Sequence, residues 1–130
     1  MKKTRLLNHL VSDAIARIGH TQCIVISDAG FPVPFGVQRI DLAIVPGLPT
    51  AAQVAEAVAA EMEVEAIIVA DELVAREQAW AEEMALLFGA PWSQMPHTEF
   101  KKVSEGAIAV IRTADVVPYH NVILISGVNY

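Results

Sequence analysis

The chain has 130 residues, a formal net charge of −6, and 54% hydrophobic against 18% charged residues. This length predicts a single domain over residues 1–130, and the apolar composition excludes a disordered chain and favours self-association. The acidic balance, with only nine scattered Lys and Arg residues, argues against nucleic-acid binding. No uncharged run reaches the ~18 residues of a membrane span. The single cysteine, Cys23, excludes an internal disulfide and favours a cytoplasmic location.

The first helix is expected to begin after Asn8, whose side chain can cap it, and to end at Gly19. Its inward side chains are expected to be Leu10, Ile15 and Ile18. A short apolar run at Cys23–Ser27 then predicts a buried strand.

A loop rich in turn residues follows from Asp28 to Gly36, and a second strand is predicted at Arg39–Val45. Thr50 and Gln53 have the spacing of a capping box, which predicts the start of the next helix. A third buried strand is predicted at Glu65–Ala70.

Asp71 is expected to cap a long helix that ends at Gly89. The remaining predicted elements are a short strand at Trp92–Met95, a short helix at Thr98–Glu105, and strands at Ala107–Ile111 and Val122–Ser126. Strands that are apolar on both sides, separated by amphipathic helices, imply a sheet covered on both faces. The predicted fold class is therefore α/β, a three-layer α/β/α sandwich with a mainly parallel central sheet.

Several kinds of chemistry have no motif in this sequence. It contains no glycine-rich phosphate loop, no nucleophile elbow, and no histidine spacing typical of a metal site. Cys23 lies within an apolar strand, where a thiol is usually inert packing. We therefore expect neither a metal nor an organic cofactor, and what remains is proton transfer and polar binding.

Three segments carry a resemblance that covers nearly the whole chain. They read I-G-H-T-Q-C-I-V-I-S-D-A-G-F-P-V-P over 18–34, R-I-D-L-A over 39–43 with V-E-A-I-I over 64–68, and P-Y-H-N-V-I-L-I-S-G-V over 118–128. This pattern resembles the family that contains ribose pyranases and fucose mutarotases. G-H-T followed by a strand and D-A-G-x-P-x-P is its most specific part.

The resemblance implies an enzyme that interconverts the pyranose and furanose forms of D-ribose, an isomerase without metal or cofactor. It assigns the role of proton donor to His20. It implies sugar binding by Asp28, His97, Tyr119 and Asn121. It also implies a homo-oligomer built on rings, such as a decamer, and a cytoplasmic place upstream of a ribokinase.

The chemistry fits these residue types. Opening a cyclic sugar requires a proton for the ring oxygen and removal of one from the anomeric hydroxyl. A histidine suits both directions because its ordinary pKa of ~6.5 keeps both forms available near neutrality. Asp28, Tyr119 and Asn121 offer the directed donors and acceptors that a neutral polyhydroxyl ligand needs.

The predicted positions raise one difficulty. Asp28 follows a strand, whereas Tyr119 and Asn121 precede one. An antiparallel edge strand would bring them together; otherwise they must come from another subunit. We favour a site shared between subunits.

Other residues have more ordinary interpretations. His120 stands where relatives carry smaller residues; its role is open, and we expect it to face solvent rather than act in catalysis. Arg112 and Asp115 are open candidates for subunit contacts. A solvated helix face is expected to consist of Glu72, Glu77, Glu82 and Glu83.

Two other functions remain open on the sequence. A fucose-type mutarotase would invert the anomeric centre through the same open chain. A non-catalytic sugar-binding module would bind ribose without changing its exchange rate.

Overall fold

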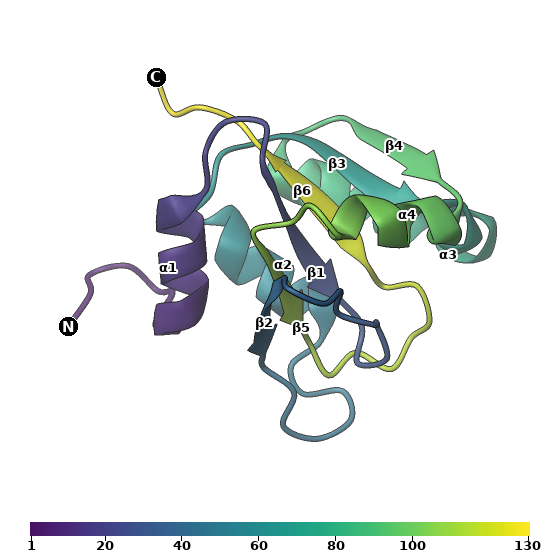
Figure 1. The fold of residues 1–130 in the computed structure, drawn as a ribbon, viewed down its shortest axis with the longest axis horizontal. Helices are drawn as coiled ribbons and strands as arrows, with labels where there is room; N and C mark the ends of the chain where they lie inside the picture. The colour runs from purple at the N-terminus through teal and green to yellow at the C-terminus, as the bar shows by residue number, and fades with distance from the viewer.

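A computed structural model describes residues 1–130 and contains a six-stranded sheet in the order β2-β5-β1-β6-β3-β4 (Figure 1). The elements in chain order are α1 His9–Arg17, β1 Cys23–Ser27, β2 Gln38–Asp41, α2 Ala51–Ala59, β3 Val64–Ala70, α3 Asp71–Phe88, β4 Trp92–Met95, α4 His97–Ser104, β5 Ala109–Arg112 and β6 Val122–Ser126. Helices cover both faces of the sheet, which confirms the predicted three-layer α/β fold. None of the helices combines the length and apolar character that a membrane crossing requires.

The sheet is mainly parallel, as predicted, and β6 is its single antiparallel strand. β6 does not lie at an edge: it lies in the middle of the sheet, between β1 and β3. Val122 at the start of β6 pairs with Ile26 near the end of β1. The residues before β6 therefore lie beside the residues after β1, although they are far apart in the sequence.

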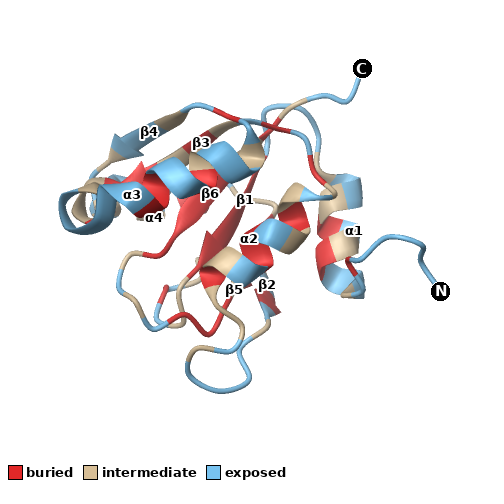
Figure 2. Ribbon diagram, turned by 180° about the vertical axis from the view of Figure 1, so that it is seen from behind, coloured by how far each residue is buried: buried red, intermediate tan, exposed pale blue.

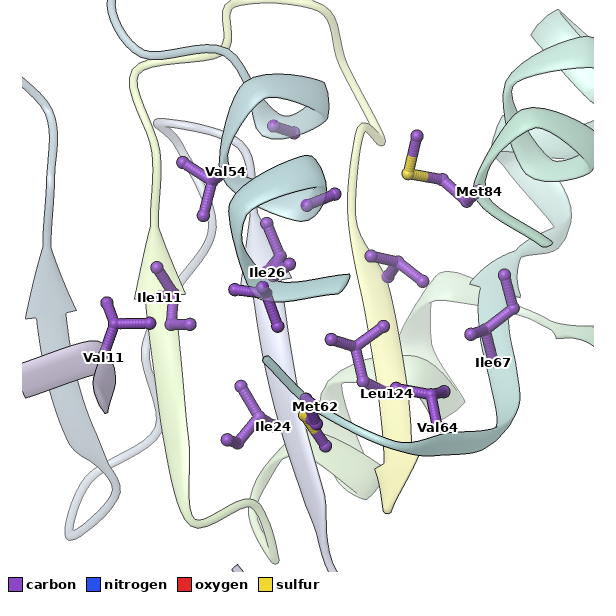
Figure 3. Packing of buried hydrophobic residues seen from close by; sticks show 14 of the residues in the cluster. Val11, Ile24, Ile26, Val54, Met62, Val64, Ile67, Met84, Ile111 and Leu124 are labelled. Atoms are coloured by element: carbon purple, nitrogen blue, oxygen red, sulfur yellow. The ribbon is translucent and has the colours of Figure 1, made fainter. Parts of the chain in front are cut away.

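Strand β1 is buried on both sides, which explains its uninterrupted apolar run. Ile24 and Ile26 point into the larger core cluster, between the sheet and helices α1, α2 and α3 (Figure 3). Cys23 and Val25 belong to a smaller cluster on the other face, which includes Phe100 of α4. Buried residues form stripes on the sheet and on the helix sides that face it (Figure 2).

The first helix begins as predicted but differs at its end. The Asn8 side chain accepts a hydrogen bond from the Val11 backbone N–H at 3.0 Å. The helix ends at Arg17, and Ile18 is already extended, so Gly19 is not a left-handed terminator. The buried face consists of Val11 and Ala14, with Ile15 and Ile18 half-buried, whereas Leu10 is exposed.

The capping box of α2 is confirmed, because Thr50 and Gln53 exchange side-chain to backbone hydrogen bonds. Gly89 ends α3 in the left-handed conformation, with φ of 62°. Asp71, however, is the first residue of α3 and makes no capping hydrogen bond. The helix is also kinked at Glu77, whose backbone angles are not helical.

Strand β2 is shorter than the predicted Arg39–Val45. Its only partner, β5, ends at Arg112, so the chain after Asp41 has no neighbouring strand to pair with. Residues 42–49 instead form a loop in which Ile44 and Val45 are exposed.

Candidate functional site

A cavity of about 430 Å³ opens at the carboxyl end of the parallel strands. Its wall comes from the loop after β1, the long connection from β5 to β6, and the start of α4, and these loops gather at one end of the sheet in Figure 1. The central position and reversed direction of β6 bring these segments together in one subunit. The polar side chains on this wall are Asp28, His97, Asp115, Tyr119 and Asn121.

Asp28 and Asn121 form a reciprocal pair. The Asp28 backbone N–H donates to Asn121 Oδ1 at 2.7 Å, and Asn121 Nδ2 donates to Asp28 Oδ2 at 3.2 Å. The Gly30 N–H donates to Asp28 Oδ1 at 3.0 Å. Because a carboxylate oxygen accepts about two hydrogen bonds, Oδ1 keeps a free position for a ligand hydroxyl.

Tyr119 lies in a tight turn beside this pair. Its φ of 68° is in the left-handed region, which few residues other than glycine adopt without strain. This conformation directs its N–H to Asp28 Oδ2 at 3.2 Å and puts the side chain on the cavity wall. The turn is closed by a bond from the Asn121 N–H to the Tyr119 carbonyl at 2.6 Å.

His97 is the first residue of α4 and lies among aromatic rings. Its ring centroid is 5.2 Å from that of Tyr119, in an edge-to-face arrangement. Burial, with a contribution from the Lys101 ammonium, holds the pKa of His97 below its ordinary value, which favours the neutral imidazole at neutral pH. Its Nδ1 is buried and has no hydrogen-bond partner within the protein. A sugar hydroxyl in the cavity is a suitable partner for such a nitrogen.

Asp115 lines the cavity and is buried, so it is not available for the subunit contacts considered from the sequence. Its carboxylate accepts from the N–H groups of Ala51 and Val117 and faces the His120 ring. Burial acts to raise the pKa of Asp115, but these three donors outweigh it and hold the pKa below its ordinary value. The carboxylate is therefore a fixed negative charge at the start of α2.

Arg112 supports the loop that carries Asp28. Its Nη1 donates to the Ala29 carbonyl at 3.0 Å, while Nε and Nη2 donate to Asp41 Oδ2. This hydrogen bond with Arg112 holds the pKa of Asp41 below its ordinary value. One side chain thus ties the ends of β2 and β5 to the cavity wall.

His20, the candidate proton donor, does not lie at this cavity. It precedes β1 whereas Asp28 follows it, and the five-residue strand alone spans roughly 16 Å at ~3.3 Å per residue. His20 is exposed, faces Glu65 Oε2 at 2.9 Å, and lines a separate cavity of about 880 Å³ between α1 and the C-terminal residues. Four of the five sequence-predicted site residues therefore converge in one subunit, and the fifth is at the opposite end of the sheet.

The expectation for His120 was wrong, because this side chain is buried. Glu72 and Glu77 are not merely solvated either: Glu72 accepts from the His97 N–H at 2.9 Å, and Glu77 faces His120. Nothing in a linear sequence marks these pairs, because each joins segments tens of residues apart.

Two further features concern nucleophilic catalysis by cysteine and metal binding. Burial raises the pKa of the Cys23 thiol, which makes it a poor nucleophile. No three His, Cys, Asp or Glu side chains are grouped so as to hold a metal ion.

Comparison with known proteins gives a consistent result over the full chain. The model of the RbsD / FucU transport protein family matches residues 1–129. A D-ribose pyranase of Laribacter hongkongensis is 49% identical, covering 98% of both chains, and that of Symbiobacterium thermophilum is 46% identical over 100% of both.

Among solved structures, Bacillus subtilis RbsD complexed with D-ribose is 44% identical, covers both chains completely, and superposes with a TM-score of 0.94. The fucose mutarotase of Streptococcus pneumoniae, in complex with L-fucose, is 17% identical over the whole of both chains, with a TM-score of 0.78, and shares the fold. With a family model that spans residues 1–129, the chain belongs to the RbsD / FucU family, as its G-H-T and D-A-G segments indicated.

Proposed function

We propose that this protein is a D-ribose pyranase, which interconverts the pyranose and furanose forms of D-ribose. The observation that carries the proposal is the cavity at the carboxyl end of the sheet, where a partly free carboxylate and an unpartnered imidazole nitrogen face the same space. Its volume of about 430 Å³ lies in the range typical of small-molecule sites. The names of the relatives, which are D-ribose pyranases, support ribose as the ligand.

Binding is assigned to the groups on the cavity wall. Asp28 Oδ1 accepts a sugar hydroxyl at its free position, and the neutral His97 ring exchanges a hydrogen bond through Nδ1. The Tyr119 ring adds a flat apolar surface next to His97. Because the backbone already fixes Asp28 and Asn121, little ordering is needed when the sugar binds.

The proton-transfer step is assigned to His20 of a neighbouring subunit. Protonation of the ring oxygen, with loss of a proton from the anomeric hydroxyl, breaks the ring C–O bond and forms an open-chain carbonyl. A different hydroxyl then adds to the carbonyl and returns the protons. General acid catalysis of this kind typically accelerates a step ~10²–10⁴-fold.

A shared site is supported by the separation of His20 from Asp28 and by exposed apolar side chains near the cavity. Val116 lines the cavity and is 63% exposed, and Ile44 and Leu48 lie exposed in the loop that follows the carboxyl end of β2, at the same end of the sheet. Such groups favour burial against another copy of the chain. We propose a ring-based homo-oligomer such as a decamer, acting in the cytoplasm upstream of a ribokinase.

Saturation-transfer NMR on D-ribose tests the proposal. The wild-type protein is expected to accelerate pyranose–furanose exchange, and His20→Ala is expected to lose most of this acceleration. The variant should stay folded, because the exposed His20–Glu65 pair contributes little to stability. Ribose binding without faster exchange would support a sugar-binding module instead. Acceleration of anomer exchange in L-fucose alone would support the mutarotase.

A further inference from the structure

His120 lies in the cavity turn but points away from the cavity. Its neighbours Tyr119 and Asn121 both line the cavity wall, whereas the His120 side chain is 10% exposed and packs toward helix α3. Its ring stacks on Trp80 of α3, with centroids 4.5 Å apart and planes 13° apart. Because the His120 ring is buried against α3, exposure to solvent does not account for a polar side chain at this position.

Both ring nitrogens of His120 face carboxylates. Nδ1 is 3.2 Å from Asp115 Oδ2, and Nε2 is 2.9 Å from Glu77 Oε2. Ionised carboxylates only accept hydrogen bonds, so both contacts are hydrogen bonds when both ring nitrogens carry a proton. The imidazolium form then makes two charge-assisted bonds, which are roughly twice as strong as neutral ones.

These contacts join three separate parts of the fold. Asp115 is already fixed by the N–H groups of Ala51, at the start of α2, and of Val117, in the cavity loop. Glu77 is at the kink of α3, where the chain leaves helical geometry. His120 thus connects α2 and α3 through the turn that holds the two cavity residues.

The turn needs such an external constraint. Tyr119 is in the left-handed region, which costs of the order of 1–3 kcal/mol for a residue other than glycine unless the surroundings impose it. Its N–H reaches Asp28 only in this conformation of the turn. We propose that His120 is a positioning residue, whose bridge from Glu77 to Asp115 holds Tyr119 and Asn121 in the geometry that binds sugar.

This inference rests on the proposed function for its effect on ribose, but its structural part can be tested without ligand. Hydrogen exchange of the full-length protein, followed by mass spectrometry over residues 116–122, measures how often the turn opens. We expect His120→Ala and Glu77→Ala to accelerate exchange there on the order of tenfold, about 1.4 kcal/mol of opening free energy. Glu77→Gln keeps an acceptor oxygen and should retain most of the protection.

Two control variants separate positioning from loss of stability. Val58→Ala removes buried core atoms in α2, and His9→Ala removes an exposed histidine. Neither should change exchange over 116–122 relative to the rest of the chain. If His120→Ala fails to fold, the pair Glu77→Ala and Glu77→Gln carries the test, because the Glu77 side chain is 43% exposed.

Ribose kinetics give the second readout. In His120→Ala and Glu77→Ala, KM for D-ribose is expected to rise about tenfold with kcat within about twofold, because His20 is untouched. The double variant should be no worse than His120→Ala alone, since Glu77 contacts the turn through His120. Unchanged exchange over 116–122 in both single variants would overturn the inference. So would additive effects in the double variant. A wild-type protein that does not accelerate pyranose–furanose exchange of D-ribose would instead count against the proposed function.

Discussion

Asp28 and Asn121 are 93 residues apart in the sequence and hold each other by two hydrogen bonds. One bond uses the Asp28 backbone N–H and the other its carboxylate, so both the chain and the side chain of Asp28 are oriented by the same amide. This arrangement exists because β6 runs antiparallel beside β1 and begins where β1 ends. The central antiparallel strand therefore allows one subunit to assemble most of the cavity.

The variant Asn121→Ala tests this pair. It leaves the Asp28 N–H without its partner in a half-buried position, which typically costs about 1–3 kcal/mol. We expect the free energy of unfolding to fall by this amount and the affinity for ribose to fall with it. Urea denaturation and ribose titration calorimetry measure the two effects. Gln94→Ala, which truncates an exposed amide on β4, should change neither.

Most of the fold could be predicted because its strands are short apolar runs and its helices carry local signals. Cys23–Ser27 and Val122–Ser126 were predicted with the correct limits, since a run of five apolar or small residues is too short for a typical helix and fits a strand buried on both faces. The prediction that the second strand continues beyond Asp41 was wrong for a non-local reason, because its partner β5 ends at Arg112. The position of β6 within the sheet depends on pairing between strands, which single-sequence patterns do not contain.

The site was predictable to a different degree. Asp28, His97, Tyr119 and Asn121 were named from the resemblance, and the structure groups them around one cavity, while their roles stay predictions. His120 was misjudged because a polar residue between two others looks exposed unless its partner is known. Glu77 is exposed as expected, and only its contact with His120 was not foreseen. His20 and the cavity are separated by the length of strand β1. The proposal that follows from this separation, a site completed by another subunit, concerns the assembly and not the single chain.

Mixing two inactive variants tests whether His20 and Asp28 act across a subunit boundary. His20→Ala lacks the proposed proton donor and Asp28→Asn lacks the proposed ligand carboxylate, so each is expected to be inactive alone. When the two chains are refolded together at random, about a quarter of shared sites combine an intact His20 with an intact cavity. Ribose exchange measured by NMR should recover to about that fraction of the wild-type rate.

The same mixture gives a clear negative result. If His20 and Asp28 of the same chain form the site, no mixed oligomer contains a complete site, because every chain lacks one of the two residues. Absence of recovery in co-refolded samples, with mixed oligomers verified by native mass spectrometry, would contradict the shared site. A mixture of His20→Ala with His9→Ala serves as the positive control.

Arg112→Lys tests the support of the Asp28 loop. Lysine keeps the positive charge near Asp41 but cannot reproduce the three hydrogen bonds that the guanidinium makes to Asp41 and Ala29. We expect ribose affinity to fall several-fold, on the order of 1 kcal/mol, because the loop is less fixed. Calorimetric titration with ribose measures the loss. Arg5→Lys, at an exposed position, is the matched control, and equal affinities in the two variants would contradict the role of Arg112.

His97 predicts a specific dependence of stability on pH. Its pKa in the folded protein is below the ordinary value because of burial and the nearby Lys101 ammonium, so between the folded and unfolded values the unfolded chain binds more protons. The stability associated with neutral His97 is thus fully present above about pH 6.5 and is lost as the pH falls toward the folded value.

Urea denaturation at fixed protein concentration, in steps from about pH 7.5 to pH 5, measures this contribution. The wild-type protein should lose stability over this interval more steeply than His97→Gln, which has no imidazole to protonate. His9→Gln should keep the wild-type slope, because His9 is exposed. In the proposed binding mode the sugar covers the His97 ring and favours its neutral form, so saturating ribose is expected to steepen the wild-type dependence further. Parallel profiles for the wild type and His97→Gln would show that His97 is equally solvated in the folded and unfolded chains, contrary to its position beside Tyr119 and Phe100.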